Sequence, residues 1–367
     1  MADILFVTWD GGGNVPPLLG IATEVQRRGH RVRVLGHTGL AATVAGAGLD
    51  FTSYPTARSF TSQRNNPPWT LAATWGGADL GRDVVAEART LGADLVVVDC
   101  LLPAAMQALA GAGIRYAVLE HMFDGFLSIL RKGPIGMMIR LRGVDWEKAL
   151  DAAACRLVAS LPSLDPAATG GTPGNLAYTG PVVEGVPATP SESTILVSLS
   201  TYRYSGMART LQRVLDAAAG LPAKVVVTTG PVVDPAELRL PANAEALRWV
   251  PHAELMPQVS MVVGHGGHST TMLALAHDLP LLVLPMHPLV DQPMVGRAIQ
   301  TAGAGRRLAK RSRPRAIRPV IEALLGEGPH RDAAARLGAE IRALRGAATA
   351  ADRIEALVGN GVPQTHG

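Results

Sequence analysis

Apolar residues in the first half of the chain gather in short runs that alternate with longer stretches of helical periodicity. The pattern predicts strands at 3–9, 31–37, 94–100 and 115–121, and helices at 16–30 and 103–113. The run at 94–100 is apolar almost throughout, which is typical of a strand buried on both faces of a parallel sheet. Repeated β-α-β units of this kind predict a doubly wound sheet.

The same alternation returns after a segment rich in Pro, Ser and Thr at 181–193, which is typical of a linker between domains. The second half predicts strands at 194–200, 223–230, 246–250, 261–267 and 280–286, and helices at 207–220, 253–258, 270–278 and within 330–359. We therefore expect an α/β protein with two doubly wound, Rossmann-like domains. The expected parts are a domain at 1–182, a linker at 183–193, a domain at 194–345, and a C-terminal helix and tail at 346–367 that can pack back on the first domain.

Two stretches interrupt the alternation in the first half. Residues 52–78 are rich in Thr, Ser, Pro and Asn, and residues 121–143 mix Met, Phe and Leu with Gly and Pro. Long irregular insertions in an α/β domain are often functional loops, and apolar, Met-rich ones suit an adaptable pocket for a lipophilic ligand. The alternative is helices packed on the core.

Composition sets the broad class of protein. Hydrophobic residues make up 47% of the 367 residues and charged ones 17%, which is the balance of a globular chain. Cys100 and Cys155 are too few for a disulfide framework and show no CxxC spacing, so we expect a cytoplasmic protein. The chain enters its first strand without a basic leader, and no apolar run reaches the roughly 20 residues of a membrane-spanning helix.

The net charge of +4 is modest, and the one dense basic stretch lies at 306–319. Its pattern favours a solvated loop and the start of a helix over a surface for nucleic acid or anionic lipid. We therefore expect no nucleic-acid partner. The sequence leaves the assembly open, with a homodimer as one option.

The densest chemical motif is "GHGGHSTT" at 264–271, where an apolar run enters a glycine turn and a helix start. Glycines let backbone N–H groups approach an anion, Ser and Thr cap helices and donate to phosphate, and a helix N-terminus favours negative charge. His265 adds a hydrogen bond or a charge. These features predict a diphosphate site, with a plain glycine turn as the alternative.

Two shorter features flank this motif. Trp249 ends a predicted strand before a proline turn, where its flat face suits a nucleobase. Asp291 and Gln292 stand side by side in a predicted loop, and an adjacent carboxylate and amide suit sugar hydroxyls. Taken singly, a core Trp and a solvated Asp-Gln pair are the alternatives.

Together these residues resemble the donor signature of the GT-B glycosyltransferases that modify small natural products in bacteria and plants. That signature runs from Trp-x-Pro-Gln through His-x-Gly to Asp/Glu-Gln, and Trp249 to Gln292 has its spacing. "RRGH" at 27–30, "VVVDC" at 96–100, the linker and the trailing helices resemble the family less specifically. The resemblance implies two domains facing a cleft.

The resemblance also assigns roles on the donor side. Trp249 stacks on the base, the backbone of Val250 binds its edge, His265 meets the diphosphate, and Asp291 and Gln292 hold sugar hydroxyls. Around the diphosphate the family places three more residues, Gly267, Ser269 and Thr270. Two positions depart from the family, since His252 stands where it has Gln, and Ser200 replaces a Gly before the phosphate-contacting Thr201.

The acceptor side departs further. The family commonly has a His-x-x-Pro general base in the first loop, oriented by an Asp after a later strand, but Asn14 and Asp99 occupy the matching positions. An amide is no base at neutral pH, so three residues are candidate substitutes, in the order Asp10, Asp99 and His121. A carboxylate base suffices for a phenol or an acidic carbon, which favours a phenolic or polyketide-like acceptor with O- or C-glycosylation.

The resemblance therefore implies an inverting, metal-independent hexosyltransferase of antibiotic biosynthesis that takes a UDP- or TDP-sugar and a lipophilic aglycone. It implies no cofactor. The alternatives are a non-catalytic nucleotide-sugar-binding helper subunit, a lipid-linked glycosyltransferase, and a nucleotide-sugar epimerase on the same fold. An NAD-dependent enzyme is disfavoured, because Pro16 stands where the third fingerprint glycine belongs.

Overall fold

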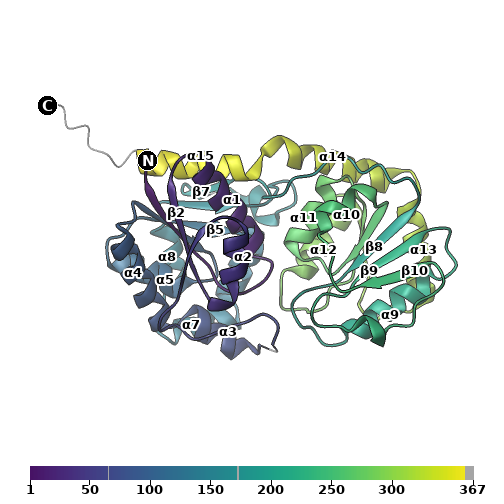
Figure 1. Ribbon diagram of the computed structural model, residues 1–367, viewed down its shortest axis with the longest axis horizontal. Helices are drawn as coiled ribbons and strands as arrows, with labels where there is room; N and C mark the ends of the chain where they lie inside the picture. The colour runs from purple at the N-terminus through teal and green to yellow at the C-terminus, as the bar shows by residue number, and fades with distance from the viewer. Residues whose placement is uncertain (65, 172, 360–367) are drawn as a thin grey trace. The chain divides into compact units, whose positions relative to one another are not determined.

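The protein is described by a computed structural model that covers residues 1–64, 66–171 and 173–359. The chain divides into two compact units. The first holds Met1–Ser62, Asn66–Val182 and the segment from Arg345 onward, and the second holds Val183–Leu344 with the few residues after Ser62. Figure 1 draws the elements of both units.

The first unit is built on a seven-stranded sheet in the order β3-β2-β1-β4-β5-β6-β7. Its strands are β1 (Asp3–Val7), β2 (Arg31–Gly36), β3 (Asp50–Ser53), β4 (Leu95–Asp99), β5 (Tyr116–Glu120), β6 (Cys155–Val158) and β7 (Leu176–Tyr178). Every neighbouring pair is parallel. The predicted strands of the first half are confirmed, and β4 is buried along its whole length.

Helices cover both faces of this sheet. They are α1 (Val15–Arg27), α2 (Ala41–Gly46), α3 (Pro68–Trp75), α4 (Ala78–Leu91), α5 (Pro103–Gly111), α6 (Asp124–Lys132), α7 (Pro134–Arg140), α8 (Trp146–Asp151) and α15 (Gly346–Gly359), with 3₁₀ turns η1 (Thr38–Leu40) and η2 (Pro166–Gly170). Leu5 and Val7 pack toward the α4 and α5 side, whereas Ile4 and Phe6 pack toward α1 and α15. This alternation along one strand is the sequence-level cause of a sheet covered on both faces.

Helix α1 begins and ends as the pattern predicts. Pro16 and Pro17 occupy its first turn, where a missing N–H costs nothing, and Gly29 follows its end with a φ of 93°. The expectation of an irregular stretch is confirmed for most of 52–78, where only α3 intervenes between β3 and α4, but it was wrong for most of 121–143, which α6 and α7 occupy. There the alternative of packed helices is the correct one, although the helices of both stretches keep several apolar side chains exposed.

The second unit has a six-stranded parallel sheet in the order β10-β9-β8-β11-β12-β13. Its strands are β8 (Thr194–Ser198), β9 (Lys224–Thr228), β10 (Ala244–Leu247), β11 (Met261–Gly264), β12 (Leu281–Val283) and β13 (Gly305–Arg307). The predicted strand at 246–250 is displaced, since β10 ends at Leu247 and leaves Trp249 in the following loop. The sheet was nonetheless predicted, except for its edge strand β13.

The helices of this unit are α9 (Met207–Ala218), α10 (His252–Leu255), α11 (His268–Ala276), α12 (Gln292–Thr301), α13 (Pro314–Leu325) and α14 (Pro329–Leu344), with 3₁₀ turns η3 (Pro235–Glu237) and η4 (Met256–Gln258). The basic stretch at 306–319 forms the end of β13, a loop and the start of α13, as its pattern indicated. Several of its side chains form hydrogen bonds with other residues of the same unit. Arg318, for example, donates hydrogen bonds to the carbonyls of Ala217 and Ala219.

Each sheet reverses its strand order at one place, between β1 and β4 in the first unit and between β8 and β11 in the second. In open α/β sheets, ligands bind outside the carboxyl ends of the strands at this point. The two places where chemistry is expected are therefore the loops after β1 and β4, and the loops after β8 and β11.

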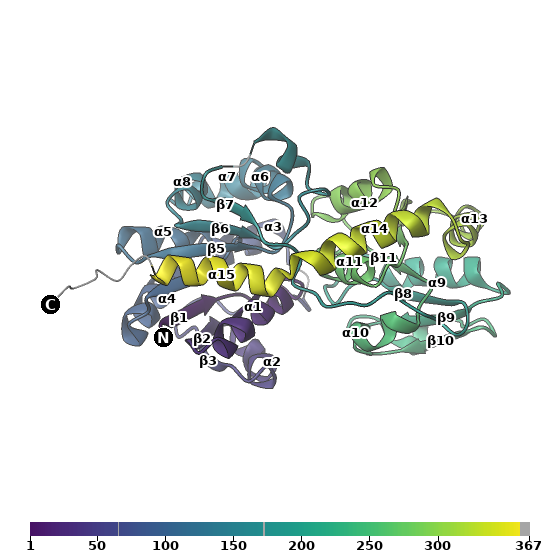
Figure 2. The same cartoon turned by 90° about the horizontal axis from the view of Figure 1, so that it is seen from above.

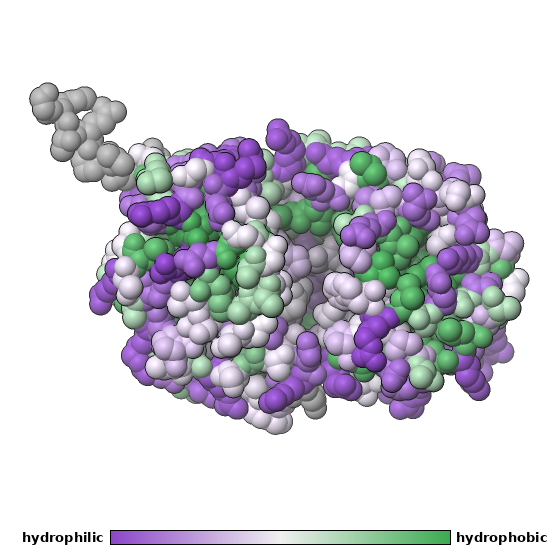
Figure 3. All heavy atoms as spheres, in the orientation of Figure 1, coloured by the Kyte–Doolittle hydropathy of each residue, from purple (hydrophilic) through white to green (hydrophobic). Residues whose placement is uncertain are grey.

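The last helix, α15, belongs to the first unit although the chain reaches it from the second. Figures 1 and 2 both place it beside α1, and Arg28 forms ion pairs with Asp352 and Glu355. Hydrophilic residues cover much of the face drawn in Figure 3, with apolar patches between them. No helix among the described residues is long and apolar enough to cross a membrane.

Candidate active site

The first cluster lies at the carboxyl edge of the first sheet and is centred on Asp99. Asp99 ends β4, is 1% exposed, and faces the loop that follows β1. Asn14 lies in that loop at the start of α1, is 2% exposed, and donates from Nδ2 to Asp99 Oδ2 over 2.8 Å. The same Nδ2 contacts Thr8 Oγ1 and the carbonyl of Trp9. Asn14 is therefore hydrogen-bonded to Asp99, the carboxylate expected to orient a general base, but its amide cannot itself act as a base.

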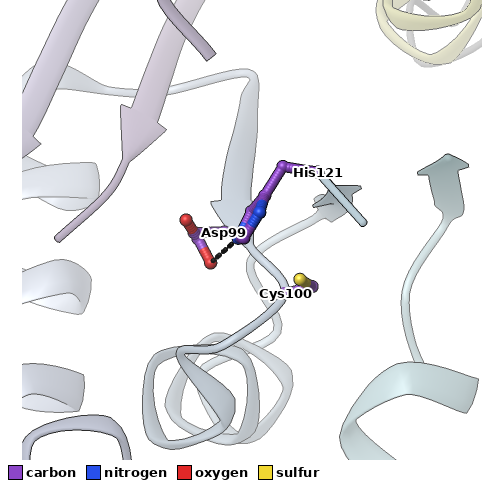
Figure 4. Close-up of side chains that lie close together, drawn as sticks. All are labelled: Asp99, Cys100 and His121. Carbon is purple, nitrogen blue, oxygen red and sulfur yellow. Dashed lines mark ion pairs between the residues drawn. The ribbon is translucent and has the colours of Figure 1, made fainter. Parts of the chain in front are cut away.

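His121 approaches Asp99 from the other side. It directly follows β5, its side chain is 9% exposed, and its Nε2 lies 3.4 Å from Asp99 Oδ1. The backbone N–H of Leu101 also donates to Oδ1. Two of the three candidate base residues, Asp99 and His121, thus lie together (Figure 4). Asn14 contacts the other oxygen of Asp99.

Asp99, Cys100 and His121 form a group whose ligand atoms lie close enough to hold a metal ion. The chemistry of this donor set does not fit one. Both oxygens of Asp99 already face N–H donors, and burial raises the pKa of the Cys100 thiol well above its usual value, which disfavours the thiolate that metals bind. We assign no metal to this group.

Asp10 lies elsewhere. Its backbone N–H contacts His37 Nδ1, its carbonyl accepts from Ser62, and its carboxylate lies near Gly39. Burial raises the pKa of Asp10, and a hydrogen bond with the Thr61 side chain partly opposes that rise. Among the described contacts, none joins Asp10 to Asn14 or Asp99. Asp10 therefore stays a candidate base without a described contact to the Asp99 cluster.

In the first loop, Gly11 makes room for side chains of the protein itself. A Cβ on Gly11 would lie 2.6 Å from the Trp9 ring and 2.7 Å from Asn14 Oδ1, so only glycine fits there. Trp9 in turn packs against Phe60 and Trp75, with ring centroids 5.0 and 5.2 Å apart. The sequence reasoning missed Trp9 and Phe60 as an aromatic cluster, because the segment that carries Phe60 has no regular periodicity.

The second cluster lies at the carboxyl edge of the second sheet. His265 follows β11, and its ring covers Gly267, where a Cβ would come within 2.5 Å of Nε2. Burial lowers the pKa of His265 to about 4, with a smaller contribution from His252, so the ring is neutral at pH 7. A neutral His265 can offer a diphosphate a hydrogen bond, and its low pKa favours this hydrogen bond over a positive charge.

The start of α11 differs from the prediction. Gly267 is the N-cap residue, the helix begins at His268, and no side chain caps it. Ser269 and Thr270 are therefore residues of the first turn and not caps, and both are partly exposed. An uncapped first turn leaves backbone N–H groups that an anion can satisfy.

Three more predicted donor residues lie in the loop after β10. Trp249 is 69% exposed, and Val250 beside it is partly exposed. His252 is turned inward, with its Nε2 3.1 Å from Thr228 Oγ1 at the end of β9, and burial lowers its pKa. His252 is thus a neutral residue that ties this loop to the sheet.

Ser200 and Thr201 follow β8, on the strand next to β11 in the sheet. Ser200 Oγ accepts a hydrogen bond from the N–H of Tyr202 over 3.0 Å and so shapes the loop. Thr201 is exposed. The loop thus presents Thr201 to solvent at the strand-order reversal of this sheet.

Asp291 and Gln292 stand at the start of α12 and play different parts. Gln292 is 2% exposed, and its Oε1 accepts from the N–H groups of Met286 and His287. Asp291 is the N-cap residue and is partly exposed. Gln292 therefore holds its loop in place, and Asp291 is the better placed of the pair to meet a ligand.

Two residues near this loop escaped the sequence reasoning. Tyr204 lies 6.5 Å from His265 and 6.1 Å from His287 between ring centroids, and burial together with Asp291 raises its pKa. Lys310 donates to the carbonyls of Met286 and Ser205 and so joins two loops. Only the three-dimensional structure brings these segments together, because their positions in the sequence carry no shared motif.

Three comparisons with known proteins bear on this site. The chain matches the family model "Erythromycin biosynthesis protein CIII-like, C-terminal domain" over residues 212–357. It is 26% identical to 4'-demethylrebeccamycin synthase of Lentzea aerocolonigenes, over 97% of this chain and 100% of that protein. It is 38% identical to elloramycin glycosyltransferase ElmGT of Streptomyces olivaceus, over 35% of this chain and 31% of that protein.

Solved structures share the fold. The calicheamicin glycosyltransferase CalG4 matches with a TM-score of 0.82 at 24% identity, over 99% of this chain and 100% of that one. The glycosyltransferase SnogD from Streptomyces nogalater matches with a TM-score of 0.74 at 23% identity, over 98% and 99%. The chain therefore has the GT-B fold and is similar over nearly its whole length to glycosyltransferases of natural-product biosynthesis.

Proposed function

We propose that this glycosyltransferase moves a hexose from a UDP- or TDP-sugar to a small lipophilic acceptor of phenolic or polyketide-like character, with inversion at the anomeric carbon and without a bound metal. It would act in the cytoplasm, which the two free cysteines support. The observation that carries the proposal is the set of loops at the carboxyl edge of the second sheet, where exposed Trp249 accompanies the uncapped start of α11.

The donor assignment rests on what each of these groups can bind. An exposed indole offers a stacking face to a nucleobase, and the first turn of α11 with neutral His265 offers N–H donors to a diphosphate. The glycosyltransferase VinC, which shares the fold with a TM-score of 0.74, was solved in complex with DTDP. The proposal does not choose between uracil and thymine.

The acceptor assignment rests on apolar side chains of the first unit that remain exposed. They are carried by α3, α6 and α7, which pack on one another within that unit. The exposed residues are Trp69, Ile129, Met137 and Leu141. Exposed apolar residues on adjoining helices suit a lipophilic partner. The spinosyn rhamnosyltransferase SpnG, which has a similar fold, was solved with spinosyn aglycone.

Charge stabilisation of the leaving diphosphate is proposed to come from the protein itself. Preorganised N–H donors at a helix start can stabilise charge as it develops, and the hydroxyls of Ser269 and Thr270 lie in the same turn. Attack from the face opposite the leaving group would invert the anomeric carbon. Asp291, at the start of α12, would hold hydroxyls of the sugar.

The proposal is tested by incubating the protein with UDP-glucose or TDP-glucose and a panel of phenols and alcohols. We expect glycoside formation with phenols, a β-linked product by NMR, and unchanged rates after treatment with EDTA. Donor consumption without an acceptor would indicate an epimerase, and binding without turnover would indicate a helper subunit. Ready transfer to simple alcohols that survives Asp10→Ala would contradict the phenolic acceptor.

Trp249→Ala tests the donor site directly. Loss of one base-stacking contact typically costs about 1–3 kcal/mol, so we expect the Kd for UDP or TDP to rise about 5- to 150-fold in titration calorimetry. Trp69→Ala, another exposed tryptophan in the other unit, is the matched control and should leave nucleotide affinity unchanged. Equal affinities of Trp249→Ala and the wild type would refute the stacking role.

A further inference from the structure

We propose that His121, positioned by Asp99, is the general base that deprotonates the acceptor. It would take the role of the first-loop histidine, whose position Asn14 occupies here. The proposal rests on the proposed function and names one further catalytic residue for it. Asp99 is the positioning residue, since it acts through His121.

The geometry around Asp99 carries the assignment. Residues that end neighbouring parallel strands meet at one edge of a sheet, so Asp99 after β4 and His121 after β5 become neighbours. Asp99 is shared between two sides, with Oδ2 facing the Asn14 amide at 2.8 Å and Oδ1 facing His121 Nε2 at 3.4 Å. The carboxylate that would orient a histidine in the first loop is therefore next to His121, which directly follows β5 (Figure 4).

The other candidates are less suited. Asn14 has no titrating group, and its Nδ2 is directed at three oxygens. Asp99 is buried and both of its oxygens face donors, so it cannot reach an acceptor hydroxyl directly. Asp10 lies against His37, Gly39 and the 61–62 segment. His121 is the one of the four that combines a basic atom with a carboxylate partner.

The carboxylate also selects the tautomer. Nε2 lies 3.4 Å from Asp99 Oδ1 without forming a hydrogen bond, and the negative carboxylate favours the proton on this nitrogen, so the basic position is then Nδ1. Other ionisable groups around it are the Cys100 thiol beside Asp99, Glu120 on its own strand, and Arg156 on β6. Arg156 donates to Glu120 and Asp124, so its charge is compensated within that neighbouring network.

The step balances as a proton transfer coupled to displacement. The acceptor O–H proton moves to Nδ1 of His121 while the acceptor oxygen forms a bond to the anomeric carbon. The bond from that carbon to the diphosphate oxygen breaks, and the nucleoside diphosphate leaves with the electron pair. The imidazolium, stabilised by Asp99, then returns its proton to solvent.

The test compares His121→Ala and His121→Gln with the wild type on three phenols of increasing acidity: para-methoxyphenol, methylumbelliferone and para-nitrophenol. General-base catalysis contributes about 10²- to 10⁴-fold, so we expect kcat for para-methoxyphenol to fall by that factor. The loss should shrink for para-nitrophenol, which is already partly ionised at neutral pH and needs a base less. A loss that is equal for all three phenols would mean a structural role and would overturn the assignment.

Asp99→Asn tests the positioning residue through the pH profile. Removing the carboxylate should lower kcat and move the acidic limb of kcat against pH to lower pH, because the imidazolium loses its stabilising charge. A limb that stays in place overturns the pairing. His30→Gln removes a second His–carboxylate pair of this unit, with Glu355 3.1 Å away, and should leave the profile unchanged. Circular dichroism and thermal unfolding check that each variant folds.

The possible outcomes distinguish a failure of the His121 assignment from a failure of the proposed glycosyltransferase function. A wild type that binds TDP but transfers sugar to none of the phenols defeats the proposed function. A wild type that transfers sugar while His121→Ala keeps its kcat within about threefold defeats only the assignment of His121. In that second case, loss of activity in Asp10→Asn would move the base to Asp10.

Discussion

At the scale of single residues, Asp99 has the hydrogen-bond geometry expected of a carboxylate that orients a histidine, but its partner is an amide. Its Oδ2 receives the amide of Asn14 over 2.8 Å, as it would receive an imidazole at that position. An amide donates the same hydrogen bond but cannot accept a proton at pH 7. A side chain that can accept a proton nevertheless lies next to this carboxylate, since His121 Nε2 is 3.4 Å from Asp99 Oδ1.

The lowered pKa of His265 leads us to expect that the unfolding free energy depends on pH. Burial lowers its pKa to about 4, whereas an unfolded chain titrates near the ordinary value of 6.5. Between these values the unfolded state binds the proton more readily, so the unfolding free energy falls as the pH drops from about 6.5 to 4. His265→Gln should weaken this loss, as measured by urea unfolding at several pH values.

The same measurement has a contrary outcome. If the unfolding free energies of His265→Gln and the wild type decline in parallel from pH 6.5 to 4, the buried neutral ring is not a source of acid sensitivity. Burial also lowers the pKa of His252 and His287 in this unit, so part of the slope should persist in the variant.

At the scale of elements, the loop between β11 and α11 depends on glycine. Gly266 has a φ of 84°, and a Cβ there would lie 2.8 Å from Val283 Cγ1 and 2.9 Å from the carbonyl oxygen of Gln292. The loop is thus pressed against β12 and the start of α12, which places His265 and the start of α11 at the edge of the sheet.

Gly266→Ala should disturb this arrangement. A left-handed conformation is unfavourable for Ala, and the Cβ contacts force the backbone to shift, so we expect a loss of about 1–3 kcal/mol in stability together with weaker UDP or TDP binding. Thermal unfolding and titration calorimetry measure the two effects. Gly46→Ala, in α2 with nothing within 4 Å of its new Cβ, is the control and should be neutral or slightly stabilising.

Elements were predicted well where the pattern was long and strong. The central strands β1, β4, β8 and β11 are apolar runs buried on both faces, and such runs leave few alternatives. The edge strand β13 was missed because Gly305–Arg307 has three residues, two of them charged and exposed, and acquires its extended form by pairing with β12. Helices α6 and α7 were missed because Gly and Pro interrupt their periodicity.

At the scale of the whole molecule, the chain returns from its second unit to complete the first. Helix α15 inserts Ala350, Ala351 and Ile354 into the core formed by α1 and the sheet. Arg28 on the neighbouring segment binds Asp352, Glu355 and the carbonyl of Ala348. The first unit is therefore built from segments more than 160 residues apart in the chain.

Ile354→Ala tests how much this last helix contributes. Ile354 is fully buried, and truncating such a side chain typically costs about 2–5 kcal/mol. We expect faster hydrogen–deuterium exchange in the peptides of α1 and α15. Arg353→Ala, an exposed neighbour, is the control and should change stability by no more than about 0.5 kcal/mol. Unchanged exchange in Ile354→Ala would show that α15 is dispensable for the first unit.

The sequence by itself determined the two doubly wound sheets and the glycine turn between β11 and α11, because hydrophobic periodicity and glycine-rich turns are local properties of the chain. It also showed that Asn14 stands where a base is expected. Only the tertiary structure decided that Asp99 lies between Asn14 and His121, because the pairing of β4 with β1 and with β5 sets those distances. Likewise, Gln292 turned out to hold its own loop, a role that depends on contacts its sequence neighbours do not reveal.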